Sequence, residues 1–188
     1  MAIKIYLDQG HNPTNPNAGA EANGLREQDI NYAVGIETAE LLRQNGAFEV
    51  LLSRPTEQTS LGNSQSESLA ERVRQANRWR ADFFISIHAN AAASPTVSGS
   101  EGYAYSEDSA GYRMGENILR GLNQSTGLRN RGMFVRPTLY VLRRTAMPAV
   151  LIELGYLTNP QDAALMDSSP ALFARGIYEG ILAYYGLT

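Results

Sequence analysis

Short apolar segments alternate with longer amphipathic segments along most of this chain. The short segments have the length and composition of buried strands, and the longer ones repeat apolar residues at helical spacing. We expect strands at 3–7, 48–52, 83–88, 103–105, 139–142 and 149–154. We expect helices at 27–45, 68–80, 112–122 and from Pro170 onward, with Ser169 as the N-cap. This alternation predicts an α/β fold in which helices flank one twisted, mostly parallel β-sheet.

The composition fits a single globular domain over residues 1–188, because 43% of the residues are apolar and only 19% are charged. The net charge of −3, without a dense Lys/Arg run, argues against nucleic acid and anionic membrane surfaces as partners. No apolar run approaches the roughly 18 residues of a membrane span, so we expect no membrane insertion. The absence of cysteine excludes disulfides, thiol catalysis and thiolate metal sites.

Polar side chains stand at the carboxyl ends of three predicted strands. His11 follows the first strand, His88 ends the strand at 83–88, and Glu153 lies within the apolar strand at 149–154. Open α/β sheets bind ligands at the carboxyl ends of their strands. If the three strands are parallel neighbours, these three side chains can therefore meet.

Glu153 is unusual because its neighbours from Ala149 to Leu157 are apolar apart from Gly155. Burying a carboxylate without a partner is unfavourable, so some group has to compensate its charge. A bound cation does so well. An ion pair with Arg143 or Arg144 is the alternative that the sequence leaves open.

The two histidines favour a metal site, although either one alone would usually be an ordinary core or surface residue. Neutral imidazole binds Zn²⁺ well, and a set of two histidines and one carboxylate leaves a coordination position for water. Candidates for the carboxylate are Glu21, Glu27 and Asp29. Glu27 faces inward at the start of its helix, whereas Asp29 points away from the apolar stripe. The alternative role for Glu27 is a favourable charge at a helix N-terminus.

Several segments match a known family in their order along the chain. They are Leu7-Asp8-Gln9-Gly10-His11, Glu27-Gln28-Asp29-Ile30-Asn31, Leu51-Leu52-Ser53-Arg54, Arg72 with Ala76-Asn77, Ala81-Asp82, Ser86-Ile87-His88-Ala89-Asn90, Arg131-Gly132, Val141-Leu142-Arg143, and Pro148-Ala149-Val150-Leu151-Ile152-Glu153. In these segments the chain resembles the zinc-dependent N-acetylmuramoyl-L-alanine amidases of bacterial cell walls over nearly its full length. The loop at His11 departs from the family, which usually has Asp-Pro-Gly-His-Gly-Gly where this chain has Gln9 and Asn12-Pro13.

The resemblance implies that His11, Glu27 and His88 bind Zn²⁺ and that Glu153 is the catalytic carboxylate. It also implies a mostly parallel sheet flanked by helices. The implied substrate is the amide that joins the lactyl group of N-acetylmuramic acid to L-alanine of the peptidoglycan stem peptide. Glu153 would take a proton from a zinc-activated water and return it to the leaving nitrogen.

Three more polar residues have roles in this hypothesis, each with a plainer alternative. Asp8 can hold a ligand histidine in place, or it can cap the turn after the first strand. Asn90 can contact the stem peptide, or it can be a turn residue. Arg131 can bind a substrate carboxylate, or it can be a solvated surface charge.

Two other functions share these residues. A zinc peptidase that cuts within the stem peptide would use the same ligands, and a non-catalytic peptidoglycan-binding module could share the fold. We expect no regulatory partner, because the segment 91–102 is too short and too rich in breakers to form a helix that covers the metal. The sequence does not indicate the oligomeric state.

The expected place of action is the bacterial cell wall. The N-terminal residues have neither the long apolar stretch nor the cleavage site of a signal peptide, so we expect release by lysis, or a domain excised from a secreted enzyme.

Overall fold

A six-stranded sheet organises the computed structural model, which describes residues 2–187. Its strands, in spatial order, are β4 (Phe48–Leu52), β1 (Ile3–Gln9), β5 (Phe83–Asn90), β8 (Ala149–Tyr156), β6 (Ser100–Ala104) and β7 (Asn130–Val135). The first four are parallel, β6 is antiparallel to β8, and β7 is parallel to β6. The prediction of a mostly parallel sheet flanked by helices is therefore confirmed. A small hairpin of β2 (Glu21–Ala22) and β3 (Leu25–Arg26) precedes the first helix.

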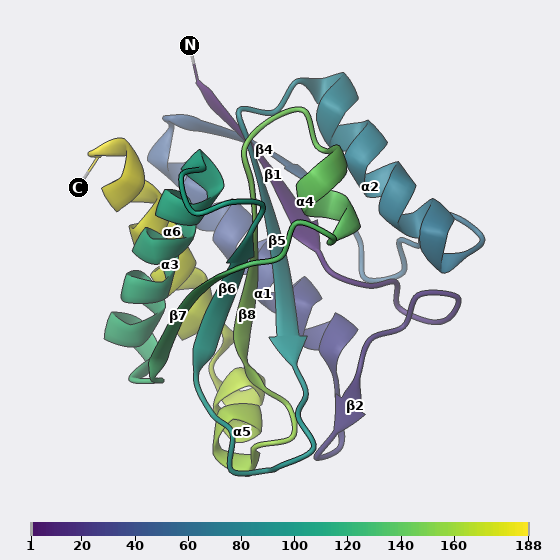
Figure 1. The fold of residues 1–188 in the computed structure, drawn as a ribbon, viewed down its shortest axis with the longest axis vertical. Helices are drawn as coiled ribbons and strands as arrows, with labels where there is room; N and C mark the ends of the chain where they lie inside the picture. The colour runs from purple at the N-terminus through teal and green to yellow at the C-terminus, as the bar shows by residue number, and fades with distance from the viewer. Residues whose placement is uncertain (1, 188) are drawn as a thin grey trace.

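Helices cover both faces of the sheet (Figure 1). One face is covered by α1 (Glu27–Asn45), α3 (Ala110–Thr126) and α6 (Pro170–Tyr185), and the other by α2 (Gln65–Trp79) and the short α4 (Tyr140–Arg144). Helix α5 (Pro160–Ser168) follows β8 at its carboxyl end. The three strands β1, β5 and β8, whose ends carry the candidate site, lie side by side at the centre of the sheet.

The core lies on both faces of the sheet, and strand alternation decides which residues enter it. Ile87 and Ile152 face the larger core under α1, α3 and α6, where every helix contributes buried apolar residues. The fully buried helical residues there include Val34, Met114, Ile118, Leu122, Phe173, Ile177 and Ile181. Because side chains alternate along a strand, His88 and Glu153 point to the opposite face.

The strand register brings three functional side chains to one level of the sheet. His88 of β5 is the register partner of Glu153 of β8, and Glu153 is the partner of Glu101 in β6. Directly paired residues on adjacent strands share a face and have their Cβ atoms about 4.5–5.5 Å apart. The sheet therefore sets a histidine and two carboxylates in a row on the face of α2 and α4.

One predicted strand is wrong: residues 139–142 lead into the helix α4 and do not join the sheet. Val141 and Leu142 are both buried against the smaller core. Two consecutive inward residues fit a helical turn, whereas a half-buried strand alternates, and a short apolar run does not separate the two.

Other boundaries also differ from expectation. Helix α2 begins at Gln65, three residues early, because the Ser64 hydroxyl accepts a hydrogen bond from the Glu67 amide at 3.2 Å. Helix α6 begins at Pro170 as expected, but the Ser169 side chain makes no capping hydrogen bond. Strand β7 and helix α5 lie in segments with no predicted element. Within residues 2–187, the helices are all too short or too polar to span a membrane.

Candidate metal centre and active site

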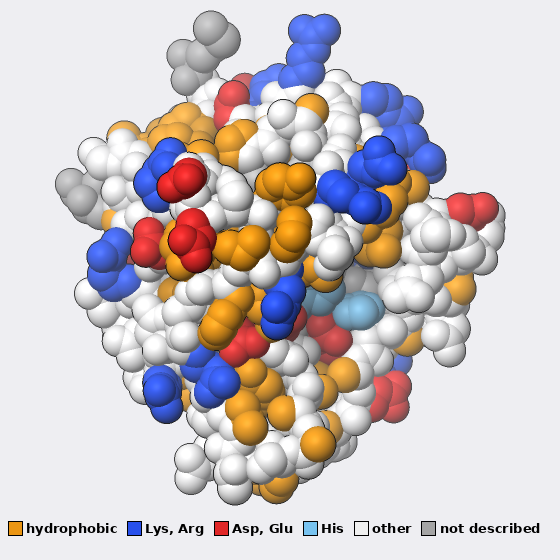
Figure 2. All heavy atoms as spheres, viewed as in Figure 1, with side chains coloured by type: hydrophobic (Ala, Val, Ile, Leu, Met, Phe, Trp, Pro, Cys, Tyr) orange, Lys and Arg blue, Asp and Glu red, His pale blue; other side chains and the backbone are white. Residues whose placement is uncertain are grey.

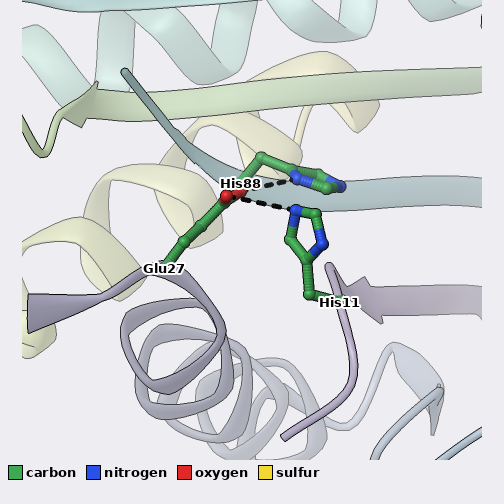
Figure 3. A group of neighbouring side chains, drawn as sticks. All are labelled: His11, Glu27 and His88. Atoms are coloured by element: carbon green, nitrogen blue, oxygen red, sulfur yellow. Dashed lines mark hydrogen bonds and ion pairs between the residues drawn. The ribbon is translucent and has the colours of Figure 1, made fainter. Parts of the chain in front are cut away.

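Two histidines and one glutamate meet at the carboxyl ends of β1 and β5 (Figure 3). His11 lies just after β1, His88 lies near the end of β5, and Glu27 is the first residue of α1. Glu27 Oε2 lies 3.1 Å from His11 Nε2, and Glu27 Oε1 lies 2.8 Å from His88 Nδ1. One potential ligand atom from each residue lies within 4.8 Å of the others, a spacing that can hold a metal ion.

Glu27 is held rigidly by the backbone around it. Its Oε2 accepts a hydrogen bond from the Ala20 amide at 3.0 Å, and its Oε1 accepts one from the Ala89 amide at 3.2 Å. Burial alone would raise the pKa of Glu27, but the hydrogen bonds and charges of the two histidines lower it far below its ordinary value. Glu27 is therefore a fixed, ionised carboxylate, while Asp29 lies outside the site in an ion pair with Arg26.

Two glycines make room for these three side chains. A Cβ atom at Gly10 would lie 2.4 Å from Cε1 of His88. A Cβ atom at Gly19 would lie 2.7 Å from Oε2 of Glu27 and 2.9 Å from Cδ2 of His11. Any larger residue at either position would displace a histidine or Glu27, so the loop between β1 and β2 is shaped around the site.

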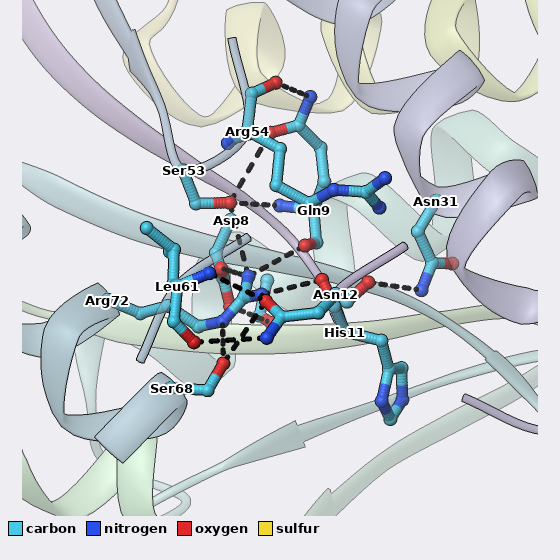
Figure 4. A network of polar contacts seen from close by, with 12 residues as sticks. Asp8, Gln9, His11, Asn12, Asn31, Ser53, Arg54, Leu61, Ser68 and Arg72 are labelled. Atoms are coloured by element: carbon cyan, nitrogen blue, oxygen red, sulfur yellow. Dashed lines mark hydrogen bonds and ion pairs between the residues drawn. The ribbon is translucent and has the colours of Figure 1, made fainter. Parts of the chain in front are cut away.

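Arg72 of α2 fixes the loop that carries His11 (Figure 4). The backbone of His11 has a φ of 70°, in the left-handed region where non-glycine residues are uncommon. The buried guanidinium of Arg72 donates to the carbonyls of His11 at 2.6 Å and Gln9 at 2.7 Å. It also forms an ion pair with Asp8, whose second oxygen accepts a hydrogen bond from Ser86 at 2.8 Å.

Asp8 therefore supports the site through Arg72. Its two carboxylate oxygens bond to Arg72 and Ser86, and within residues 2–187 neither makes a hydrogen bond to a histidine ring. Burial alone would raise the pKa of Asp8, but Arg72 lowers it below its ordinary value. Among the described residues, the Asp8 carboxylate thus contributes to the site through Arg72 and Ser86 and makes no hydrogen bond to His11 or His88.

Glu153 lies beside His88, its register partner in β5. Its Oε2 is buried and makes no hydrogen bond to any described residue. Arg143 and Arg144, the alternative partners, are exposed and form no salt bridge to it within the described chain. Burial raises the pKa of Glu153 well above its ordinary value, and the charges of Glu27 and Glu101 raise it further.

Asn90 and Arg131 both donate a hydrogen bond to Glu101, a residue that the sequence analysis does not single out. Asn90 Nδ2 donates to Glu101 Oε1 at 3.0 Å, and Arg131 Nε donates to Glu101 Oε2 at 2.8 Å. The Tyr103 and Tyr156 hydroxyls donate to the same carboxylate. Burial alone would raise the pKa of Glu101, but these hydrogen bonds and the charge of Arg131 lower it.

The two histidines of the site are partly exposed to solvent. Figure 2 shows both histidines, in pale blue, in a hollow with acidic side chains beside them. The side chains of His11 and His88 are 21% and 18% exposed. A cavity of about 140 Å³ adjoins them, and Leu69 of α2 and Tyr140 of α4 also line it.

Comparison with known proteins identifies the family. A sequence profile of the N-acetylmuramoyl-L-alanine amidases matches residues 5–183. The chain belongs to this family. It is thus a member of a family of hydrolases, and the resemblance noted from the sequence is confirmed.

Individual relatives agree with this assignment. N-acetylmuramoyl-L-alanine amidase LytC of Bacillus subtilis (strain 168) is 34% identical over 185 residues, which cover 96% of this chain and 35% of LytC. N-acetylmuramoyl-L-alanine amidase CwlM of Bacillus licheniformis is 36% identical over 194 residues, which cover 99% of this chain and 70% of CwlM. The chain thus spans about a third of LytC and more than two thirds of CwlM.

A solved structure supports the fold over its whole length. The catalytic domain of CwlV, an N-acetylmuramoyl-L-alanine amidase from Bacillus (Paenibacillus) polymyxa var. colistinus, superposes with a TM-score of 0.86 at 31% identity. The superposition covers 99% of this chain and 99% of that one.

Proposed function

We propose that this chain hydrolyses the amide between the lactyl group of N-acetylmuramic acid and L-alanine in peptidoglycan, with zinc as its cofactor. One observation carries the mechanism: a buried carboxylate oxygen of Glu153, without a partner, lies beside a group of two histidines and a glutamate that can hold a metal. The family supports the reaction and the cell wall as its place. The ligands His11, Glu27 and His88 and the catalytic role of Glu153 are parts of the proposal.

The donor set fits zinc. Two imidazoles and one carboxylate match the ligands of catalytic zinc sites, which keep a fourth position for water. The amides of Ala20 and Ala89 hold Glu27 in one orientation, and the glycines at 10 and 19 leave the space that the ligands need. Zinc held there would supply Lewis acidity to the scissile carbonyl and to the attacking water.

Glu153 moves the proton in this mechanism. As a carboxylate it accepts the proton of the attacking water. As a carboxylic acid it then donates that proton to the nitrogen of the leaving alanine. A pKa raised by burial suits both steps, because a group that accepts and returns one proton works best with a pKa near the working pH.

Asn90 and Arg131 are the proposed contacts to the stem peptide. Both are partly exposed, and both donate a hydrogen bond to Glu101. The Asn90 side chain also accepts a hydrogen bond from the Ala91 amide at 2.8 Å, which is a turn-residue role, so Arg131 is the better supported of the two.

We propose further that activity requires no activating partner. The loop at 91–99 is tied down away from the histidines: Asn159 donates to the Pro95 carbonyl at 2.9 Å, and Asp162 accepts hydrogen bonds from Ser98 and Gly99. Purified zinc-loaded protein should therefore degrade isolated peptidoglycan by itself. A requirement for a second protein would contradict this part of the proposal.

Product analysis tests the reaction. We expect zinc-loaded protein to split a muramoyl peptide into a free lactyl carboxylate and an intact peptide with a new L-alanine amine, both identified by mass spectrometry. Fragments cut within the peptide would instead indicate a peptidase, and binding without cleavage would indicate a non-catalytic module. Protein treated with a chelator is the control, and added Zn²⁺ should restore its activity.

A further inference from the structure

Glu101 is a buried carboxylate that the mechanism does not use. It is 5% exposed, and each of its oxygens accepts two hydrogen bonds. The donors come from the ends of β5 and β8, from β6 itself and from β7. Because each oxygen of Glu101 already accepts two hydrogen bonds, Glu101 has no free position for a substrate proton. Any effect of Glu101 on the reaction therefore has to act through the four side chains that donate to it.

Arg131 is the only cation among those groups, and its guanidinium is bound to Glu101 along the edge that carries Nε. Its Nε donates to Glu101 Oε2 at 2.8 Å, and its guanidinium lies over the ring of Tyr156 with 5.3 Å to the centroid. Nη1 makes a long contact of 3.4 Å to the Ser98 carbonyl, and Nη2 makes no hydrogen bond to any residue in the range 2–187. The side chain is 29% exposed.

This arrangement leaves the outer edge of the guanidinium free for a ligand. The planar fork of arginine matches a carboxylate in two parallel hydrogen bonds, and holding it beforehand reduces the entropy lost on binding. The ring of Tyr156 and the Glu101 carboxylate fix the plane and the direction of that fork. Glu101, which holds Arg131, is the register partner of Glu153 across β6 and β8, and Arg131 lies one strand further out, on β7.

We propose that Glu101 is a positioning residue that presents Arg131 as a carboxylate-binding subsite on the peptide side of the scissile amide. The assignment of this subsite to the peptide side of the scissile amide rests on the proposed function. The lactyl carboxyl group is consumed in the scissile amide, so the free carboxylates of a muramoyl peptide lie on its peptide portion. The subsite would make the enzyme prefer a peptide with a free carboxylate over the same peptide with that group amidated.

Paired substrates test the subsite. Two muramoyl peptides that differ only in one peptide carboxylate, free in one and amidated in the other, are cleaved by the zinc-loaded wild-type protein and by variants. We expect Arg131→Ala to raise KM for the free acid by about tenfold, the effect of losing a charged hydrogen bond, and to leave kcat and the amidated substrate within about twofold. Glu101→Gln should raise KM for the free acid in the same selective way, but by less, since Arg131 keeps its own charge.

Arg129→Ala is the matched control, because Arg129 is an exposed arginine two residues away with no side-chain hydrogen bond within the described chain. It should behave as wild type on both substrates. Thermal unfolding of each variant checks the fold, and Arg131→Ala keeps the test valid if Glu101→Gln is unstable. An equal loss on both substrates, or no loss with Arg131→Ala, would overturn the subsite.

Binding of the product peptides separates this inference from the proposed function. Calorimetry with the free and amidated L-alanyl peptides needs no turnover. Cleavage of both substrates without any preference refutes the subsite and leaves the amidase intact. Carboxylate-selective binding through Arg131 without cleavage refutes the amidase and leaves the subsite intact.

Discussion

Replacing Glu153 with glutamine removes the titratable carboxyl group and keeps the size and packing of the side chain. The amide has nearly the same shape, and Oε2 of Glu153 makes no hydrogen bond within residues 2–187 that the substitution would break. Zinc content should remain near one ion per chain, because Glu153 is not among the three residues that can hold the metal. Turnover should fall by about 10²–10⁴-fold, which is the usual contribution of a general acid–base group.

The same variant makes a stability prediction with a definite sign. The folded pKa of Glu153 is raised above its unfolded value of about 4.3. The metal-free native state therefore holds a proton that the unfolded state has released, so this group makes stability fall as pH rises from about 4 through the folded pKa. Each unit of elevation removes about 1.4 kcal/mol, and Glu153→Gln should abolish that part of the pH dependence.

Three measurements check this prediction: zinc by mass spectrometry, the rate on a muramoyl peptide, and urea unfolding of metal-free protein between about pH 4 and 8. Glu107→Gln is the control, because Glu107 is exposed and makes no side-chain hydrogen bond within the described chain. Loss of zinc from Glu153→Gln would make Glu153 a ligand. A rate near that of wild type would refute its catalytic role, and an unchanged pH profile of stability would refute the raised pKa.

Three further substitutions probe the support of the site. His88→Ala should lose zinc and activity together, and metal analysis beside the rate assay checks this; full activity without bound metal would contradict the cofactor. Gly19→Ala should weaken zinc binding by about tenfold or more, because the added Cβ would lie 2.7 Å from Oε2 of Glu27. Competition with a chelator measures the zinc affinity, and an unchanged affinity would mean that the loop shifts to accommodate the Cβ. Arg72→Met should lower the free energy of unfolding by about 3–5 kcal/mol, since it leaves Asp8 buried without its partner, and adding Asp8→Asn should recover part of the loss in urea unfolding.

The convergence of His11, Glu27 and His88 could be predicted because it depends on strand order and direction. The apolar runs that end at His88 and contain Glu153 mark two buried strands, and parallel neighbours deliver such residues to one edge. Glu27 could be chosen over Asp29 by its angle from the apolar stripe of α1. In the structure Glu27 lies between the histidines, and Asp29 pairs with Arg26 in solvent.

The groups around the ligands could not be predicted from the residues alone, because their roles depend on contacts between distant segments. Glu101 lies outside the strand expected at 103–105, and its partner Arg131 lies on β7, an edge strand without a clear alternating pattern. Arg72 matches the family pattern, but only the fold shows that it reaches 61 residues back to the His11 carbonyl. Helix α4 was missed as a helix because a five-residue apolar turn carries too little periodicity.

Charge compensation distinguishes the three carboxylates of this site. Glu101 is balanced by Arg131, and Glu27 by two backbone amides and the two histidines. Glu153 lies between them with no cation or donor among the described residues, and both neighbours raise its pKa. A second arginine at that position would hold Glu153 ionised, because its positive charge would lower the pKa of the carboxyl group. In the proposed mechanism the unpaired Glu153 is the group that transfers the proton, whereas Glu101 can be a fixed anchor because its charge is already matched by Arg131.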